Sequence, residues 1–275
     1  MSAHGTSQAR RTTVRDLLEM KERDEKIVAL TAYDVLFARI LDECGVDVIL
    51  VGDSLGQVIF GYESTLYVTL DDMIHHARAV RRGVQRALMV VDMPFLSYQV
   101  SVADALRNAG RILQETGAEA VKLEGGDPAI CERITALVRA GIPVMGHLGL
   151  TPQSVHALGG YRVQGRGPDQ AARLRDEAKR IADAGVFSMV LELMPTALAG
   201  EITRSVDVPT IGIGAGAEVD GQVLVLHDML GINEGFQPRF LRRFAELGSA
   251  ARKGVSDYIN AVREGSYPGP EHSFD

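Results

Sequence analysis

The sequence has no tryptophan, two cysteines and no long apolar segment. Disulfide-stabilised scaffolds and structural zinc sites both need several cysteines at short spacings, so Cys44 and Cys131 are expected to be reduced thiols. A helix that crosses a bilayer needs about 20 consecutive apolar residues, and no stretch of the chain approaches that length. These absences exclude a disulfide scaffold, and we expect no membrane partner.

An excess of positive charge is also lacking. The chain has 29 lysines and arginines against 36 aspartates and glutamates, which gives a net charge of -7. Proteins that bind nucleic acid usually carry a basic surface, so we do not expect that partner either. The polar residues 1–13 contain Arg10 and Arg11, but the apolar segment of a secretory signal does not follow. We expect a disordered tail over residues 1–13 and a cytoplasmic location.

What the chain does contain is a regular alternation of strand-like and helix-like segments. The strand-like segments are short and apolar, which is typical of parallel strands buried on both faces. Several of the amphipathic segments between them end at a glycine, such as Gly117 and Gly185, as helices often do. The candidate strands are Ile27–Ala32, Val46–Gly52, Leu88–Asp92, Ala120–Glu124, Pro143–His147, Ser188–Leu193, Thr210–Gly214 and Val223–His227.

Eight strands with interposed helices and no break in composition predict an α/β fold, a closed (β/α)8 TIM barrel. An open doubly wound sheet is the alternative fold. A short N-terminal capping helix is expected over Val14–Arg23, and extra C-terminal helices around Phe240–Leu247 and Ala250–Arg263. The hydrophobic content of 46% supports one large core, so residues 14–275 are expected to form a single domain.

Three of the candidate strands end at an acidic residue. The apolar runs before Asp53, Asp92 and Glu124 give no packing reason for a carboxylate at that point. In a (β/α)8 barrel the active site lies at the C-terminal ends of the strands, so these three side chains are expected to converge. Carboxylate oxygens without cysteine suit a hard divalent cation, Mg²⁺ above all. A helix cap or a loop salt bridge is the alternative for any one of them.

Other polar residues stand at the same ends of neighbouring strands. Lys122 is two residues before Glu124 and therefore points to the same side of its strand. A cation that holds a keto acid acidifies the adjacent carbon, and Lys122 would neutralise negative charge on the substrate or its enolate. Glu192 lies inside an apolar run as a buried carboxyl and is a candidate general base, with an ion pair to Lys122 or an arginine as the alternative. His147 ends a further strand.

Several stretches, taken together, closely resemble the ketopantoate hydroxymethyltransferase family. The resemblance runs from about Thr12 to the C-terminus, and its most specific stretch is Gly-His-Leu-Gly-Leu-Thr-Pro-Gln at residues 146–153. Tyr67 is a small departure, since the family often has proline there. The other matching stretches are Thr31–Asp34, Val51–Gly56, Val121–Gly126, Gly159–Tyr161, Val163–Arg166, Ile211–Gly216 and Tyr267–Ser273.

The resemblance implies an enzyme that transfers the one-carbon unit of 5,10-methylenetetrahydrofolate to 3-methyl-2-oxobutanoate, forming 2-dehydropantoate in the first step of pantothenate biosynthesis. The reaction would run through an enolate chelated to Mg²⁺. The proton-accepting glutamate of the family falls on Glu192, and His147 takes an auxiliary role. The family's metal ligands fall on Asp53, Asp92 and Glu124. Its keto-acid contacts fall on Asp53, Ser54, Asp92 and Lys122.

The same resemblance implies a homo-oligomer, commonly a decamer, whose other partners are small-molecule substrates. One rival is another Mg²⁺-dependent keto-acid barrel, an aldolase or carbon–carbon lyase of the phosphoenolpyruvate-mutase kind, which needs no folate. The second rival is a catalytically inactive barrel that serves as a structural or ligand-sensing oligomer. The presence of all three acids together with Lys122 and Glu192 argues against an inactive barrel.

Overall fold

The computed structural model describes residues 10–274, so residues 1–9 of the predicted tail lie outside the described residues. At the start of the described chain, the backbone N–H of Thr12 donates to the carbonyl of Arg86 at 2.7 Å. The contacts within the chain divide it into two compact units, one that ends at Val225 and one that starts at Leu226. Our expectation of a single domain over residues 14–275 stays a prediction.

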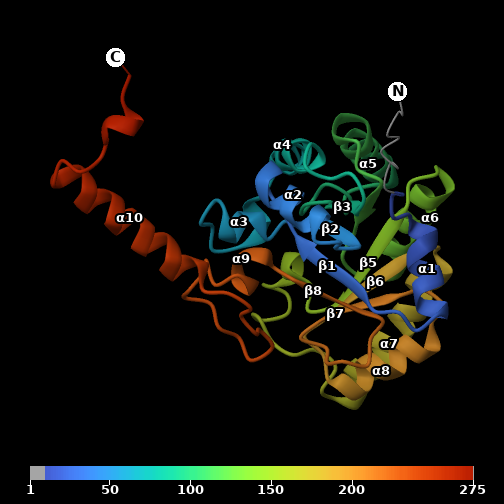
Figure 1. Ribbon diagram of the computed structural model, residues 1–275. Coiled ribbons are helices and arrows are strands. Elements are labelled where there is room, and N and C mark those ends of the chain that lie inside the picture. Colours follow the sequence, from blue (N-terminus) through green and yellow to red (C-terminus); the bar gives the residue numbers. More distant parts are fainter. Residues whose placement is uncertain (1–9, 275) are drawn as a thin grey trace. The chain divides into compact units, whose positions relative to one another are not determined.

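The first unit is a closed barrel of parallel strands (Figure 1). The last strand pairs with the first as well as with its predecessor, which closes the sheet. The predicted TIM barrel is therefore confirmed, and the open doubly wound sheet is wrong. The strands are β1 (Ile27–Thr31), β2 (Val48–Val51), β3 (Leu88–Asp92), β4 (Ala120–Lys122), β5 (Val144–Gly149), β6 (Ser188–Glu192), β7 (Thr210–Ile213) and β8 (Gly221–Leu224).

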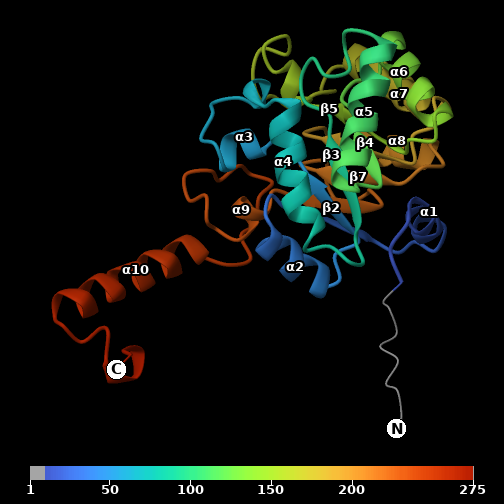
Figure 2. The same cartoon turned by 90° about the horizontal axis from the view of Figure 1, so that it is seen from above.

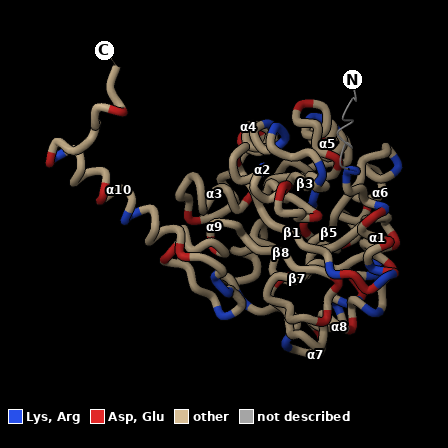
Figure 3. Tube along the Cα trace, viewed as in Figure 1, with Lys and Arg blue, Asp and Glu red and all other residues tan. Residues whose placement is uncertain are grey.

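In the described chain β7 and β8 are joined without a helix, and each earlier pair of successive strands is joined through helices. They are α2 (Val35–Glu43), α3 (Leu55–Val58), α4 (Leu70–Arg81), α5 (Val102–Thr116), α6 (Pro128–Arg139), α7 (Pro168–Asp183) and α8 (Thr196–Ser205), with 3₁₀ helices η1 (Thr65–Tyr67) and η2 (Pro152–Ser154). Helix α4 packs against β2 and β3, and α5 against β4 (Figure 2). Basic and acidic residues both occur along outer helices such as α4 and α7 (Figure 3).

The predicted capping helix is confirmed as α1 (Val14–Glu22). It begins at a capping box, in which the Thr13 hydroxyl accepts from the N–H of Asp16 at 3.3 Å and the Asp16 carboxylate accepts from the N–H of Thr13 at 2.8 Å. Leu17 of this helix is fully buried and belongs to the same apolar cluster as the inward residues of the strands. The helix therefore contributes directly to the barrel core.

The inward positions of the strands change from apolar to charged along the barrel. Side chains alternate between the two sides of a strand, so every second residue faces the interior. The apolar inward positions include Ala29, Val48, Leu50, Leu88, Val90, Ala120, Met145, Val190, Ile211 and Val223. Two residues beyond Val90, Ala120, Met145 and Val190 stand Asp92, Lys122, His147 and Glu192. The last layer of the barrel interior, at the C-terminal ends of the strands, is therefore built from ionisable groups.

The second unit, residues 226–274, contains α9 (Leu226–Met229), α10 (Leu247–Arg263) and the 3₁₀ helix η3 (Pro270–His272). The predicted end of the last strand is wrong, because that strand stops at Leu224 and His227 lies in α9. Among the helices of residues 10–274, none combines the length and the apolar character needed to cross a bilayer.

The helix expected around Phe240–Leu247 does not form in the described chain. Backbone N–H groups in this segment bond to the end of α9 in place of their own carbonyls. The N–H of Phe244 donates to the carbonyl of Met229, and that of Leu247 to the carbonyl of Leu230, both at 2.9 Å. These hydrogen bonds give the backbone N–H groups of the segment their partners without a helix. Helix α10 starts only at Leu247.

Candidate active site

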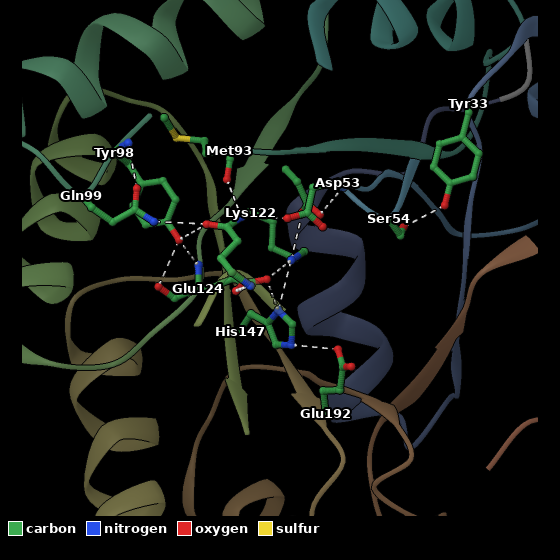
Figure 4. A network of polar contacts seen from close by, with 12 residues as sticks. Tyr33, Asp53, Ser54, Met93, Tyr98, Gln99, Lys122, Glu124, His147 and Glu192 are labelled. Atoms are coloured by element: carbon green, nitrogen blue, oxygen red, sulfur yellow. Dashed lines mark hydrogen bonds and ion pairs between the residues drawn. The ribbon is translucent and has the colours of Figure 1, made fainter. Parts of the chain in front are cut away.

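Charged side chains from four neighbouring strands meet at one end of the barrel. Asp92 and Lys122 are register partners at the ends of β3 and β4, and His147 and Glu192 come from β5 and β6. Because the strands are parallel, their C-terminal ends share one face of the barrel. The structure thus brings the ionisable residues named from the sequence into one group, with Asp53 and Glu124 beside them (Figure 4).

Asp53 and Asp92 are buried neighbours. The backbone N–H of Asp53 donates to Asp92 Oδ2 at 3.0 Å, and the two residues are 4% and 2% exposed. Burial, reinforced by the charges of Asp92 and Glu124, raises the pKa of Asp53 well above its ordinary value. Burial also raises the pKa of Asp92, although the charge of Lys122 opposes this. A proton or a cation that neutralises these two carboxylates is therefore stabilised at this site.

Lys122 supplies positive charge at the centre of the group. Its Nζ lies 3.0 Å from Asp92 Oδ1 and 4.0 Å from Glu124 Oε1. Burial alone would lower the pKa of Lys122, but the charges of Asp92, Glu124 and Asp53 outweigh it and raise the pKa. Lys122 is therefore an ammonium ion, and this one positive charge faces three buried carboxyl groups.

His147 lies between two glutamates. Its Nδ1 is 3.4 Å from Glu124 Oε1 and 3.2 Å from Lys122 Nζ, and its Nε2 is 3.2 Å from Glu192 Oε2. Burial and the Lys122 charge oppose protonation, but the two glutamates outweigh them and raise the pKa of His147 to about 9. For Glu124, burial would raise the pKa, but His147 and Lys122 lower it. An imidazolium at His147 therefore links the two carboxylates.

Glu192 differs from the expectation for a carboxyl inside an apolar run. Its side chain is 16% exposed, whereas that of Glu124 is 3% exposed. The backbone bends just after it, at Leu193. Its ion-pair partner in the described chain is His147, and neither Lys122 nor an arginine takes that place. The glutamate is thus held at one oxygen and reachable by a substrate.

The backbone around Glu192 is tightly constrained. Leu193 has a φ of 45°, which is uncommon for a residue other than glycine. Its N–H donates to the carbonyl of Ile213 at 2.9 Å, and its carbonyl accepts from the N–H of Gln164 at 2.8 Å. A Cβ on Gly149, the register partner of Glu192, would lie 2.1 Å from the Glu192 carbonyl oxygen. Close backbone packing therefore fixes where the glutamate emerges.

Sequence reasoning missed three residues that contact the predicted ones. The Tyr33 hydroxyl lies 2.8 Å from Ser54 Oγ, so it orients the predicted substrate-binding serine. Tyr98 and Gln153 are buried and bond to Glu124. Gln153 ends the most specific stretch of the family resemblance, which was the available signal for it. Tyr98 follows β3 without a strand-end signal of its own.

The acids of the group could hold a cation through their oxygens. Asp92 Oδ1 and Glu124 Oε1 are buried and face charged side chains, with Lys122 Nζ 3.0 Å from the first and His147 Nδ1 3.4 Å from the second. Oxygen ligands of this kind fit a hard divalent ion such as Mg²⁺. As they stand, however, no three His, Cys, Asp or Glu side chains among residues 10–274 are grouped closely enough to hold a metal ion. The three-carboxylate metal site stays a prediction.

The raised pKa of His147 predicts a pH dependence of stability. Its folded-state pKa of about 9 lies above the value of about 6.5 for an unfolded histidine. The stabilisation from the imidazolium is therefore fully present below pH ~6.5 and is lost as the pH rises through the folded-state pKa. We expect the free energy of unfolding of the metal-free protein, measured with urea at several pH values, to fall across that window. His147→Gln should flatten the decline, and an equal decline in both proteins would contradict the assignment.

A family model for ketopantoate hydroxymethyltransferase matches residues 11–270 of this chain. The chain is 55% identical to the 3-methyl-2-oxobutanoate hydroxymethyltransferase of Syntrophotalea carbinolica, over 96% of this chain and 99% of that protein. It is 54% identical to the protein of the same name from Carboxydothermus hydrogenoformans, over 96% of this chain and 95% of the relative.

Solved structures with similar folds are much more distant in sequence. A phosphonopyruvate hydrolase in complex with oxalate and Mg²⁺ has a TM-score of 0.60 at 11% identity, covering 94% of this chain and 92% of its own. A 2,3-dimethylmalate lyase of the PEP mutase/isocitrate lyase superfamily has a TM-score of 0.58 at 16% identity, covering 94% and 93%. At such identities the likeness shows the barrel fold alone.

Proposed function

The chain belongs to the ketopantoate hydroxymethyltransferase family, and we propose that it transfers the one-carbon unit of 5,10-methylenetetrahydrofolate to 3-methyl-2-oxobutanoate, giving 2-dehydropantoate. One observation in the structure carries the proposal: the apolar barrel interior ends in a layer of three carboxyl groups, a lysine, a histidine and a partly exposed glutamate. Relatives 52–55% identical bear the hydroxymethyltransferase name, whereas proteins of the rival keto-acid class resemble this chain only in fold, at 11–17% identity.

The keto acid needs positive charge and hydrogen-bond donors for its carboxylate and keto oxygens. Lys122 provides the charge, and its raised pKa keeps the ammonium protonated at neutral pH. Ser54 Oγ provides a hydroxyl beside Asp53, in an orientation set by the Tyr33 hydroxyl at 2.8 Å. Because these groups are fixed by the fold before the substrate arrives, little reorganisation is needed on binding.

Glu192 takes the proton from C3 of the keto acid in this proposal. The C3–H bond breaks, the proton moves to the carboxylate, and the electron pair becomes the enolate. The enolate forms the new C–C bond to the one-carbon unit, both C–N bonds of that unit to the folate break so that tetrahydrofolate leaves, and water supplies the hydroxyl oxygen of the product. His147, 3.2 Å from Glu192 Oε2, holds one carboxylate oxygen and leaves the other for the substrate. Lys122 lowers the energy of the enolate, because its charge lies where negative charge develops.

Asp53 and Asp92 would hold a divalent cation, with Glu124 bound directly or through water. Such a cation, Mg²⁺ in our proposal, would polarise the keto group and make the C3 proton more acidic. The donor set is all oxygen, which supports a hard cation. The four carboxyl groups of the site, with Glu192 included, outnumber its two cationic side chains, Lys122 and His147, and a divalent cation would neutralise the excess of negative charge.

We propose a homo-oligomer on the basis of helix α10. Val255, Tyr258, Ile259 and Val262 follow helical spacing, so they share one face, and each is between 38% and 58% exposed. Within the described chain, none of the residues of α10 is buried. A second copy of the chain would cover this apolar face. The decameric size is proposed on the family resemblance alone, and the cytoplasmic location on the sequence alone.

A product assay tests the proposed reaction. With the keto acid, 5,10-methylenetetrahydrofolate and Mg²⁺ all present, we expect 2-dehydropantoate to form, and omission of the folate should abolish it. Cleavage of a keto acid without folate would instead support the aldolase or lyase rival. A calorimetric titration that shows no metal-dependent binding of the keto acid would support an inactive barrel.

A further inference from the structure

We propose that Gln153 is a positioning residue that orients Asp53 and Glu124 for metal binding, an inference that rests on the proposed metal-dependent reaction. Gln153 lies in η2, after β5, and is only 5% exposed. It is uncharged, and its amide oxygen, which could otherwise bind a cation, already accepts from the Tyr98 hydroxyl and Gln99 Nε2. What distinguishes it is that it bonds to two of the three predicted metal-binding carboxylates at once.

Gln153 uses two different groups to reach the two acids. Its backbone N–H donates to Glu124 Oε2 at 3.0 Å. Its side-chain Nε2 donates to Asp53 Oδ2 at 2.9 Å and to the carbonyl of Met93 at 2.9 Å. One residue therefore ties together the ends of β2 and β4 and the segment just after β3.

The orientation of the Gln153 amide follows from its partners. The carbonyl of Met93 can only accept, so the atom 2.9 Å from it must be the NH₂ group. The amide oxygen then accepts from the Tyr98 hydroxyl at 3.0 Å and from Gln99 Nε2 at 3.2 Å. The Tyr98 oxygen in turn accepts from the N–H of Glu124 at 3.1 Å. Every polar atom of the amide has a partner, so its direction is fixed.

These donors determine which carboxylate oxygens remain available. Asp53 Oδ2 and Glu124 Oε2 are held by Gln153, and Asp92 Oδ2 is held by the N–H of Asp53. The opposite oxygens face cationic side chains instead, Asp92 Oδ1 at 3.0 Å from Lys122 Nζ and Glu124 Oε1 at 3.4 Å from His147 Nδ1. Holding one oxygen of each carboxylate stops its rotation, so the second oxygen keeps one direction. Ligands that are already oriented need little rearrangement when a cation binds, so the free-energy cost of binding is small.

A glutamine is suited to this role because its donors carry no net charge. A lysine or arginine at the same place would neutralise a carboxylate and compete with the cation for it. The amide instead holds Asp53 and leaves the negative charge of the three acids in place to attract a cation. The ammonium of Lys122 already contacts Asp92, with Nζ 3.0 Å from Oδ1.

The test compares divalent-cation binding by Gln153→Met and the parent protein. Methionine has nearly the same volume but no donor. Titration calorimetry with Mg²⁺ alone, without keto acid, should show a dissociation constant 10–100-fold higher for the variant, the loss typical for partners that orient metal ligands. Gln222→Met is the control, since the Gln222 amide also donates to a carbonyl, that of Gly216 at 2.8 Å, but is exposed. It should bind Mg²⁺ like the parent.

A purely structural role would lower the thermal midpoint of Gln153→Met and leave its dissociation constant unchanged. An unchanged constant in the folded variant would therefore overturn the inference while the proposed function stands. If Gln153→Met does not fold, Tyr98→Phe takes its place, because it removes the donor to the amide oxygen; a several-fold weaker affinity is expected, and parent-like affinity would overturn the inference. A parent protein that binds no Mg²⁺ would overturn both the inference and the metal-dependent mechanism.

Discussion

Exchange of the C3 proton of 3-methyl-2-oxobutanoate into heavy water is expected to slow by about 10²–10⁴-fold when Glu192 is replaced by glutamine, the usual cost of losing a general base. Glutamine keeps the size of the side chain and can still accept a hydrogen bond from His147 Nε2, now 3.2 Å from Glu192 Oε2. It cannot take a proton from carbon. The measurement is loss of the C3–H signal by proton NMR, with the parent protein and the variant at equal concentration.

A binding measurement shows whether Glu192 acts as the base or only helps to bind the keto acid. Glu192→Gln should still bind 3-methyl-2-oxobutanoate in calorimetry, because Lys122 and Ser54 remain. Glu201→Gln is a matched control, since Glu201 is an exposed glutamate that pairs with Arg175 on the outer helices. Its exchange rate should equal that of the parent. Parent-like exchange in Glu192→Gln would sink the base assignment, and another group would have to remove the proton.

Replacing Lys122 with methionine is expected to cost both stability and activity. The ammonium is 5% exposed and pairs with Asp92, which is 3% exposed, so removing it leaves buried carboxyl groups without their cation. Breaking a buried pair from one side typically costs about 3–5 kcal/mol of unfolding free energy. Loss of the charge that stabilises the enolate should also lower kcat by about 10²–10³. Urea unfolding of the metal-free protein and steady-state kinetics measure the two effects.

An exposed lysine shows whether burial is the cause. Lys253 pairs with Asp257 at 2.6 Å, but its side chain is 78% exposed. Such surface pairs contribute about 0–1 kcal/mol, so Lys253→Met should barely change the unfolding free energy. If Lys122→Met were as stable as Lys253→Met, the carboxyl groups around Lys122 would have to be neutral in the folded protein without it.

The sequence was sufficient to predict the barrel and the meeting of the strand-end charged side chains, because both depend on local patterns. Short apolar runs indicate buried parallel strands, and a closed barrel places all their C-terminal ends together. A carboxylate at the end of such a run, as at Asp92, is therefore visible without any structure. The two-residue spacing of Lys122 and Glu124 also gave their common side directly.

Gln153 and Tyr98 could not be predicted in this way. Gln153 bonds to Asp53 across 100 positions of sequence, and Tyr98 to Glu124 across 26. Their roles depend on how the loops after β3 and β5 fold over the strand ends, and no periodicity encodes that. A neutral polar residue in a loop is usually read as a solvent-exposed residue, so the local sequence does not identify Gln153 or Tyr98 as part of the site.

The partial exposure of Glu192 and the end of the last strand were also beyond sequence reasoning. The apolar run around Glu192 indicates a buried strand. The sequence does not show at which residue of the strand solvent exposure begins. In Val223–His227 the apolar pattern continues past Leu224, while the backbone turns into α9. Strand-like and helix-like apolar patterns are alike over so few residues.

The change from apolar to charged inward positions has a consequence for how this chain can evolve. Apolar side chains in the last layer would extend the core and avoid the cost of burying ions, since well-packed hydrophobic replacements of buried ion pairs are often stabilising. Selection for stability alone would therefore replace the ionisable residues of this layer with apolar ones and abolish the activity. Thermostable descendants of this chain must gain their stability elsewhere, in the outer helices and loops, and leave this one layer costly.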